Sequence, residues 1–283
     1  MPIRGKYDRF VGAVFIGVAV GMVVAGLLDF FGAPPGAVNA AVMPTATLAV
    51  VLLITHGSRT MGFGRLVLLA ALAAFIGFGF EYFGVRTGTV FGGHYRYNEE
   101  HYRGVMVFDV PVAVPVFWAV FIYTGYSTVN TFLLWLGRVQ PRRTAHDAAL
   151  LLLLVALDSM MVMALDMFMD PIVVNRGGWE WADEGPYFGI PIGNFVGWFV
   201  VTAIVTTLFR TYEYLRPAPP CTAHNAIRLI PPLGYGLVAV MFALHAVKEQ
   251  MDGVALAGLA VMLPFVLTNL LCFACRKAQA PLD

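Results

Sequence analysis

Charged residues are scarce in this sequence. Only 12% of its 283 residues are Asp, Glu, Lys or Arg, whereas soluble domains carry about 25%. The net charge of +1 provides no basic surface of the kind that binds nucleic acids. These shortages exclude a soluble domain and predict that the chain has no nucleic-acid partner.

Cysteine and histidine are also scarce. Three cysteines do not make a disulfide framework, and the pair Cys272 and Cys275 lacks the second pair of ligands that a structural zinc ion needs. The six histidines are never three or four residues apart, unlike the clusters of membrane di-iron enzymes. His94 and His101, with two glutamates between them, are the nearest approach to a metal site. Because phosphate-binding and dinucleotide motifs are also missing, we expect neither a metal nor another cofactor.

Hydrophobic residues, in contrast, make up 59% of the chain, and the mean hydropathy is +0.75. Several apolar runs exceed the roughly 20 residues that a helix needs to cross a bilayer. We therefore predict an all-α fold, a polytopic transmembrane helical bundle that forms a single integral membrane domain over residues 1–283. The first apolar run, from Phe10 to Leu28, is too long for a signal peptide, so we expect a retained helix. About eight spans are expected, at residues 10–31, 36–56, 63–84, 108–136, 147–170, 187–209, 226–247 and 254–275.

Lysine and arginine are unevenly distributed over the connections between these spans. Of the 18 such residues, 13 fall on one side, which predicts that this side is cytoplasmic. With an even number of spans, both termini are then cytoplasmic in a multi-pass protein of the cell membrane. The connections that hold Glu81–Asn98 and Asp170–Asn194 lie on the opposite, extracytoplasmic face. Because both are rich in aromatic residues, we expect these two loops to build one site.

Six carboxylates lie in or near the predicted spans. A charge at bilayer depth costs several kcal/mol, so such groups face the protein interior and are functional candidates. Asp166 and Asp170 are four residues apart on one helix face, and Pro171 predicts that this helix ends there. Glu81 begins a glycine-rich stretch, whereas Asp158 is as well explained by a hydrogen bond to a neighbouring helix. The six are Asp29, Glu81, Asp109, Asp158, Asp166 and Asp170.

Two groups of residues form motifs around the three favoured acids. The first comprises Glu81, Gly84, Thr87, Gly88, Phe91, Gly92, Tyr95 and Tyr97, then Pro111, Pro115 and Trp118. The second comprises Asp166, Asp170, Pro171, Trp179, Trp181, Tyr187, Gly189, Pro191, Asn194, Gly197 and Trp198. Together the motifs resemble the signature of a carotenoid biosynthesis family of membrane proteins, which contains bisanhydrobacterioruberin hydratases and CruF-type carotenoid 1',2'-hydratases. The resemblance covers a core of roughly residues 60–210.

The resemblance implies a cofactor-independent hydro-lyase that hydrates the terminal double bond of an acyclic carotenoid. A carboxylic acid protonates the double bond, and water captures the tertiary carbocation to give a tertiary alcohol. Glu81, Asp166 and Asp170 are the expected catalytic residues, with the acid and base roles left open. The expected partners are the lipophilic carotenoid, membrane lipid and other enzymes of the pathway. Substrate binding is expected from Phe91, Tyr95, Tyr97, Trp118, Trp179, Trp181, Tyr187, Asn194 and Trp198.

Three other interpretations are compatible with the same residues. The aromatic side chains are also typical of the belt at a membrane surface. A carotenoid or isoprenoid cyclase would use the same acids and aromatic rings while excluding water from the cation. A proton-coupled transporter would use the acids as a relay, although the sequence has no inverted repeat of the kind many transporters show.

Overall fold

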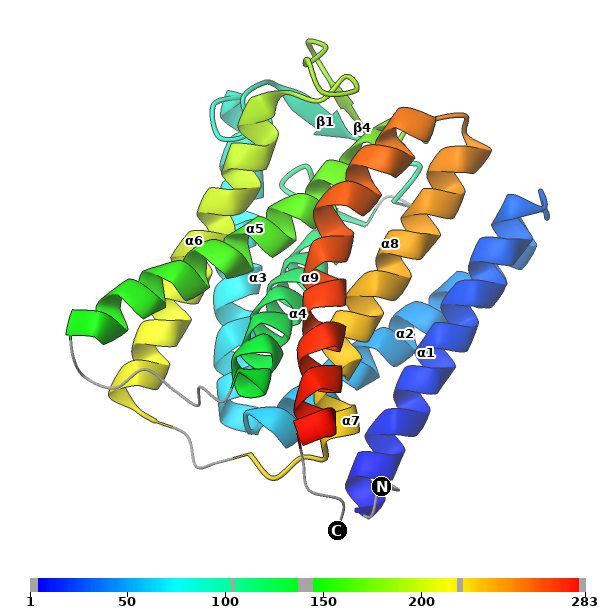
Figure 1. The fold of residues 1–283 in the computed structure, drawn as a ribbon. Coiled ribbons are helices and arrows are strands. Elements are labelled where there is room, and N and C mark those ends of the chain that lie inside the picture. Colours follow the sequence, from blue (N-terminus) through cyan, green and yellow to red (C-terminus); the bar gives the residue numbers. More distant parts are fainter. Residues whose placement is uncertain (1–4, 103–104, 137–144, 218–220, 280–283) are drawn as a thin grey trace. The chain divides into compact units, whose positions relative to one another are not determined.

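The computed structural model describes residues 5–102, 105–136, 145–217 and 221–279. Five arginines that enter the predicted membrane orientation lie outside these residues, namely Arg4, Arg103, Arg138, Arg142 and Arg143. The described chain is predominantly helical, and the all-α prediction is confirmed (Figure 1). The helices are α1 (Lys6–Phe30), α2 (Pro35–Thr60), α3 (Phe63–Thr87), α4 (Ala113–Trp135), α5 (Ala145–Asn175), α6 (Ile192–Leu215), α7 (Asn225–Arg228), α8 (Ile230–Lys248) and α9 (Asp252–Gln279). The short strands are β1 (Tyr95–Tyr97), β2 (Met106–Val107), β3 (Val110–Pro111) and β4 (Trp179–Trp181).

Among the described residues, 7 helical segments are long and apolar enough to cross a membrane. They are α1, α2, α3, most of α5, α6, α7 together with α8, and most of α9. The remaining predicted span corresponds to α4, whose 23 residues reach about 35 Å at 1.5 Å per residue. Its second half carries Tyr, Thr, Ser and Asn side chains, which lower its hydropathy. The chain is therefore a multi-pass membrane protein. Of the eight predicted spans, α4 is the one that does not appear among these seven segments.

The chain divides into two compact units. Unit 1 contains Met1–Val67, Asn130–Val139 and Ala218–Asp283, whereas unit 2 contains Leu68–Val129 and Gln140–Pro217. Every residue predicted to act in catalysis or substrate binding belongs to unit 2. The assignment of one integral membrane domain to the whole chain stays a prediction.

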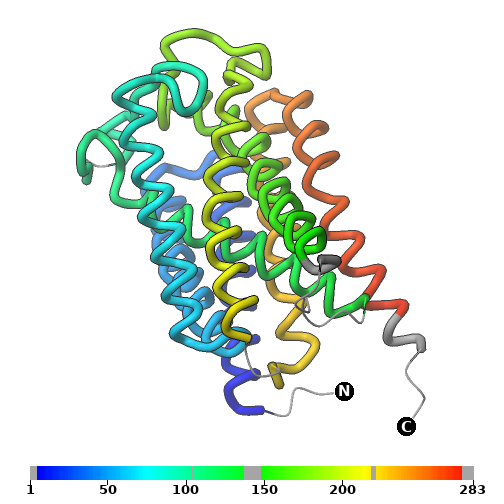
Figure 2. The backbone as a smooth tube through the Cα atoms, turned by 90° about the vertical axis from the view of Figure 1, so that its left-hand side faces the viewer, coloured from blue at the N-terminus to red at the C-terminus, as the bar shows by residue number. Residues whose placement is uncertain are grey.

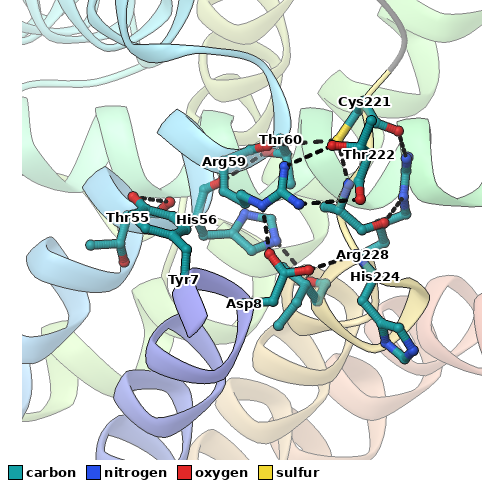
Figure 3. Close-up of polar contacts among 12 residues, drawn as sticks. Tyr7, Asp8, Thr55, His56, Arg59, Thr60, Cys221, Thr222, His224 and Arg228 are labelled. Atoms are coloured by element: carbon teal, nitrogen blue, oxygen red, sulfur yellow. Dashed lines mark hydrogen bonds and ion pairs between the residues drawn. The ribbon is translucent and has the colours of Figure 1, made fainter. Parts of the chain in front are cut away.

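In unit 1, helix α1 is held at both ends by ion pairs. Near its start, the buried Asp8 accepts hydrogen bonds from Arg59 Nε at 2.5 Å and from the backbone N–H of His224 at 2.9 Å (Figure 3). Arg59 also donates to the hydroxyl and carbonyl oxygens of Thr222. Near the other end, Asp29 accepts a hydrogen bond from Lys248 Nζ at 2.9 Å. These ion pairs account for Asp29, one of the six carboxylates, as a structural residue of unit 1.

In unit 2, helices α5 and α6 pack against each other and enclose a buried ion pair. Asp158 on α5 accepts two hydrogen bonds from Arg210 on α6, at 2.6 and 2.8 Å. The Arg210 guanidinium also lies 4.6 Å from the centre of the Tyr126 ring. Paired in this way, the two charges avoid most of the cost of burying one of them alone. Asp158 thus bonds to a neighbouring helix, which is the structural alternative predicted for it.

The predicted helix end at Asp170 was wrong, because α5 continues through Pro171 to Asn175. A proline has no N–H group, so the carbonyl oxygen of Met167, four residues earlier, loses its usual helical donor. The Tyr187 hydroxyl donates to that oxygen at 3.2 Å. A donor from outside the helix therefore replaces the missing bond, as is common for prolines in membrane helices. The sequence rule failed because it considers only the local backbone.

Candidate active site

The two aromatic-rich connections meet in a short antiparallel ribbon of β1 and β4. Figures 1 and 2 show this region at the end of α3 and the start of α6, which run side by side. Arg96 and Glu180 lie on the exposed outer face and form an ion pair at 2.9 Å. Because side chains alternate along a strand, four aromatic rings share the inner face. The register pairs Tyr95 with Trp181, Arg96 with Glu180, and Tyr97 with Trp179.

Glycines let the connection after α3 pack closely against α6. The buried Phe91 ring fits between Gly84 on α3 and Gly197 on α6, and a Cβ atom at either glycine would lie 2.7 or 2.4 Å from that ring. Next to it, Gly92 has a positive φ of 78°, which favours glycine. A Cβ atom on Gly92 would lie only 2.6 Å from the Cα atom of Gly193. This close approach fixes the first connection at the start of α6.

Glu81 is buried and accepts three hydrogen bonds from uncharged donors. Its Oε2 atom accepts from the hydroxyls of Tyr95 at 2.6 Å and Tyr97 at 2.7 Å. Its Oε1 atom accepts from the indole Nε1 of Trp118 at 3.2 Å. These donors come from β1 and α4, so the position of the carboxylate depends on two elements outside its own helix. The nearby cation Arg86 lies over the Tyr82 ring and 3.9 Å from Asp109.

Asp166 and Asp170 are joined by the side chain of Asn194. The Asn194 Nδ2 group donates to Asp166 Oδ2 at 2.7 Å and to Asp170 Oδ2 at 2.8 Å. Asp170 Oδ1 accepts a further bond from Trp179 Nε1 at 2.5 Å. Asp166 Oδ1 is buried and has no hydrogen-bond partner within the described part of the chain. This oxygen is therefore available to a group other than the described residues.

The ribbon links Glu81 to the aspartate pair. Tyr97 bonds to Glu81 while Trp179 bonds to Asp170, and the centres of these two neighbouring rings are 5.8 Å apart. Burial, together with the negative charges of Glu81 and Asp170, raises the pKa of the Tyr102 phenol. The two bonded rings thus connect Glu81 and Asp170 through one strand pair. We call Glu81, Asp166 and Asp170 the carboxylate site.

Aromatic rings cover the carboxylate site. The Trp181 ring lies 4.9 Å from the Tyr95 ring, and its indole Nε1 is buried with no hydrogen-bond partner among the residues that the structure describes. Burial and the charge of Glu81 raise the pKa of both Tyr95 and Tyr97, so these phenols keep their protons and serve as donors. The four inner rings, which we call the aromatic cover, are Tyr95, Tyr97, Trp179 and Trp181.

The remaining predicted residues have different surroundings. Trp118 and Trp198 stack with their ring centres 4.2 Å apart, whereas Tyr187 bonds to the α5 backbone and contacts Phe195. Asp109 occupies an exposed turn between β2 and β3.

Two features of this region were not predicted. Tyr102 is absent from the residues predicted to bind substrate, although its ring lies 5.7 Å from Tyr97. The hydrogen bond between Trp118 and Glu81 joins residues 37 positions apart, a separation that carries no periodic signal. No three His, Cys, Asp or Glu side chains form a group suited to hold a metal ion in the ranges described.

The fold and this site together define a multi-pass helical membrane protein with three buried acids beneath aromatic rings. Residues 37–268 match the family described as carotenoid biosynthesis protein, and the chain belongs to that family. The predicted family is thereby confirmed over a longer stretch than the two motifs cover. Bisanhydrobacterioruberin hydratase of Haloarcula japonica is 28% identical over 211 residues, which are 72% of this chain and 67% of that protein. No solved structure shows a significant match.

Proposed function

We propose that this protein is a carotenoid hydratase that adds water to the terminal double bond of an acyclic carotenoid. The main support is that Glu81, Asp166 and Asp170 lie together under the aromatic cover. Membership of the carotenoid biosynthesis family supports a carotenoid substrate, and the hydratase relative supports this reaction type. Acid-catalysed hydration needs a proton donor, a water molecule and stabilisation of a cation, and the site has candidates for each role.

The reaction proceeds in two balanced steps. A carboxylic acid transfers its proton to the inner carbon of the terminal double bond, and the outer carbon becomes a tertiary carbocation. The oxygen of a water molecule bonds to that carbon, and one of its protons passes to the carboxylate formed in the first step. The product is a tertiary alcohol, and the acid is regenerated. No electrons leave the substrate, so the reaction needs no oxidant or reductant.

Asp166 is the acid whose hydrogen bonds best fit proton donation. Both oxygens of Glu81 and both oxygens of Asp170 accept bonds from protein donors. Asp166 Oδ2 is held by Asn194, while its Oδ1 atom is buried and unbonded within the described residues. A proton on Oδ1 can therefore reach a substrate that enters the site, as general acid catalysis requires. We assign Asp166 as the proton donor.

Glu81 fits the role of stabilising the cation. Its three donors fix the position of its negative charge, and a preorganised charge lowers the energy of a developing opposite charge. The faces of Tyr95 and Trp181 add to this effect, because aromatic rings attract cations by roughly 0.5–2 kcal/mol each. The indole Nε1 of Trp181, which has no hydrogen-bond partner among the residues described, is a suitable donor to the reacting water. The same rings shield the cation from bulk water, so that only the bound water molecule reacts with it.

Expression in a bacterium that accumulates lycopene tests this function. The pigments are separated by chromatography and weighed by mass spectrometry. We expect products heavier by one or two waters from the unmodified chain and from Asp109→Asn, a control on an exposed turn. Asp166→Asn, although present in the membrane, should leave lycopene unchanged. A product of unchanged mass and altered retention would show cyclisation and contradict hydration, as would unaltered lycopene with the unmodified chain.

A further inference from the structure

Helix α5 lacks one of its own backbone hydrogen bonds in the turn that carries Asp166 and Asp170, which we call the acid-bearing turn. Pro171 has no N–H group, so the carbonyl oxygen of Met167 has no helical donor, and the proline ring crowds that same carbonyl group. Met167 directly follows Asp166 in the chain. A proline also disfavours the helical conformation of the residue before it, which here is Asp170. The helix alone therefore holds the two acids less firmly than an uninterrupted helix would.

The Tyr187 hydroxyl supplies a donor to the acid-bearing turn from the connection between β4 and α6. It donates to the Met167 carbonyl oxygen at 3.2 Å. The Tyr187 ring also packs edge to face against the buried Phe195 on α6, with the ring centres 5.0 Å apart. Phe195 follows Asn194, whose amide group donates to both acids of the turn. One side chain thus contacts both helices that position the aspartate pair.

The backbone around Tyr187 is fixed in a tight turn. The backbone groups of Tyr187 and Ile190 bond to each other in both directions, at 3.3 and 2.9 Å. Between them, Phe188 and Gly189 have positive φ angles of 49° and 86°, the pattern of a type I′ turn. A bulky residue such as Phe188 keeps a positive φ only where the surrounding structure enforces it. A Cβ atom on Gly185 would collide with the Ile190 backbone, so the turn also packs closely against the preceding chain. The hydroxyl that reaches α5 therefore comes from a rigid support.

We propose that Tyr187 is a positioning residue whose hydroxyl takes the place of the missing helical donor and so fixes the direction in which Asp166 points. The inference rests on the proposed function for the role of Asp166 as proton donor, but not for the contact itself. Tyr187 then acts through the acid-bearing turn without touching the substrate, in contrast to the substrate-binding role that the sequence predicts for it. Because the donor comes from the connection and not from the helix, the turn adopts its final form only when that connection is folded against it.

A double-mutant cycle on the full-length protein in lipid nanodiscs tests this role. Tyr187→Phe removes only the hydroxyl, whereas Pro171→Ala restores the missing N–H group with the most favourable helix residue. In the unmodified chain, Tyr187→Phe should lower kcat about tenfold and change KM for lycopene by less than about twofold, because a small misplacement of a reacting group slows the chemical step. In the Pro171→Ala chain, the same substitution should lower kcat by less than about twofold, since the helix then supplies the donor itself. The matched control is Tyr214→Phe, which removes a hydroxyl near the other end of α6 and should leave kcat unchanged.

Hydrogen exchange measures the contact without any turnover. The backbone amides of residues 168–175 lie in and after the acid-bearing turn. Their exchange should be faster in the Tyr187→Phe protein, because the turn opens more readily when it loses a hydrogen bond. Adding Pro171→Ala should return the exchange to nearly the unmodified rate.

Three results would overturn the inference. They are an equal loss of kcat from Tyr187→Phe in both backgrounds, a loss that appears in KM alone, and exchange that Tyr187→Phe leaves unchanged. Failure of the proposed function has a different signature. An unmodified chain that makes no hydrated product, but whose exchange responds to Tyr187→Phe and recovers with Pro171→Ala, would retain the contact and reject hydration. Hydration that proceeds equally well with and without the Tyr187 hydroxyl would retain the proposed function and reject the positioning role.

Discussion

At the scale of single residues, the contacts of the three acids assign different roles to groups that look alike in the sequence. The sequence predicts Glu81, Asp166 and Asp170 because carboxylates at bilayer depth are costly and because two motifs surround them. It leaves their roles open, since a role depends on partners such as Trp118 and Asn194 that lie far along the chain. That Oδ1 of Asp166 has no hydrogen-bond partner among the described residues is visible only in the folded protein.

The hydrogen bonds to Glu81 lead to a prediction about rate. Glu81→Gln removes the charge that faces the cation, and we expect turnover to fall by about 10²- to 10³-fold. Tyr97→Phe removes one of the two phenol donors to Oε2 and should cost about tenfold. Arg96→Gln, on the exposed face of the same strand, is the control and should leave the rate unchanged. Initial rates of lycopene conversion by isolated membranes measure all three, and equal rates for Arg96→Gln and Glu81→Gln would reject the role given to Glu81.

At the scale of secondary structure, long helices could be predicted and short strands could not. Apolar runs predict a membrane helix by themselves, because every backbone polar group in a bilayer must be satisfied within the segment. Strands β1 and β4 have three residues each and are separated by 81 intervening residues, so no local pattern predicts their pairing. The sequence does predict that the two loops come together, because the distribution of basic residues places both loops on one face of the membrane.

The packing of Phe91 between two helices gives a prediction at the same scale. Gly197→Ala places a methyl group 2.4 Å from the Phe91 ring, and we expect a destabilisation of about 1–3 kcal/mol. The double variant Gly197→Ala with Phe91→Leu should recover part of that loss, because the smaller side chain leaves room. Gly79→Ala meets nothing within 4 Å and is the control. Thermal unfolding in detergent measures the stability of each variant. If the destabilisations caused by the two single substitutions simply add in the double variant, the proposed contact is contradicted.

At the scale of the whole molecule, the chain is a multi-pass membrane protein of the carotenoid biosynthesis family. Its carboxylate site lies entirely within unit 2. Composition alone predicts the membrane class, because 12% charged residues cannot cover a soluble surface. The cytoplasmic placement of both termini stays a prediction, since it rests on counting basic residues and not on contacts. Division into two units depends on long-range packing, for which the sequence carries no signal.

The most direct test of the proposed hydration follows the atoms that are added to the substrate. The purified protein in nanodiscs is given lycopene in water enriched in oxygen-18, and in a second reaction in deuterium oxide. Hydration by proton transfer and water capture should give an alcohol that carries one heavy oxygen per hydrated end in the first reaction. In the second reaction, the alcohol should carry one carbon-bound deuterium next to each alcohol carbon. A product with unlabelled oxygen, or one with deuterium and no added oxygen, would contradict hydration by proton transfer and water capture.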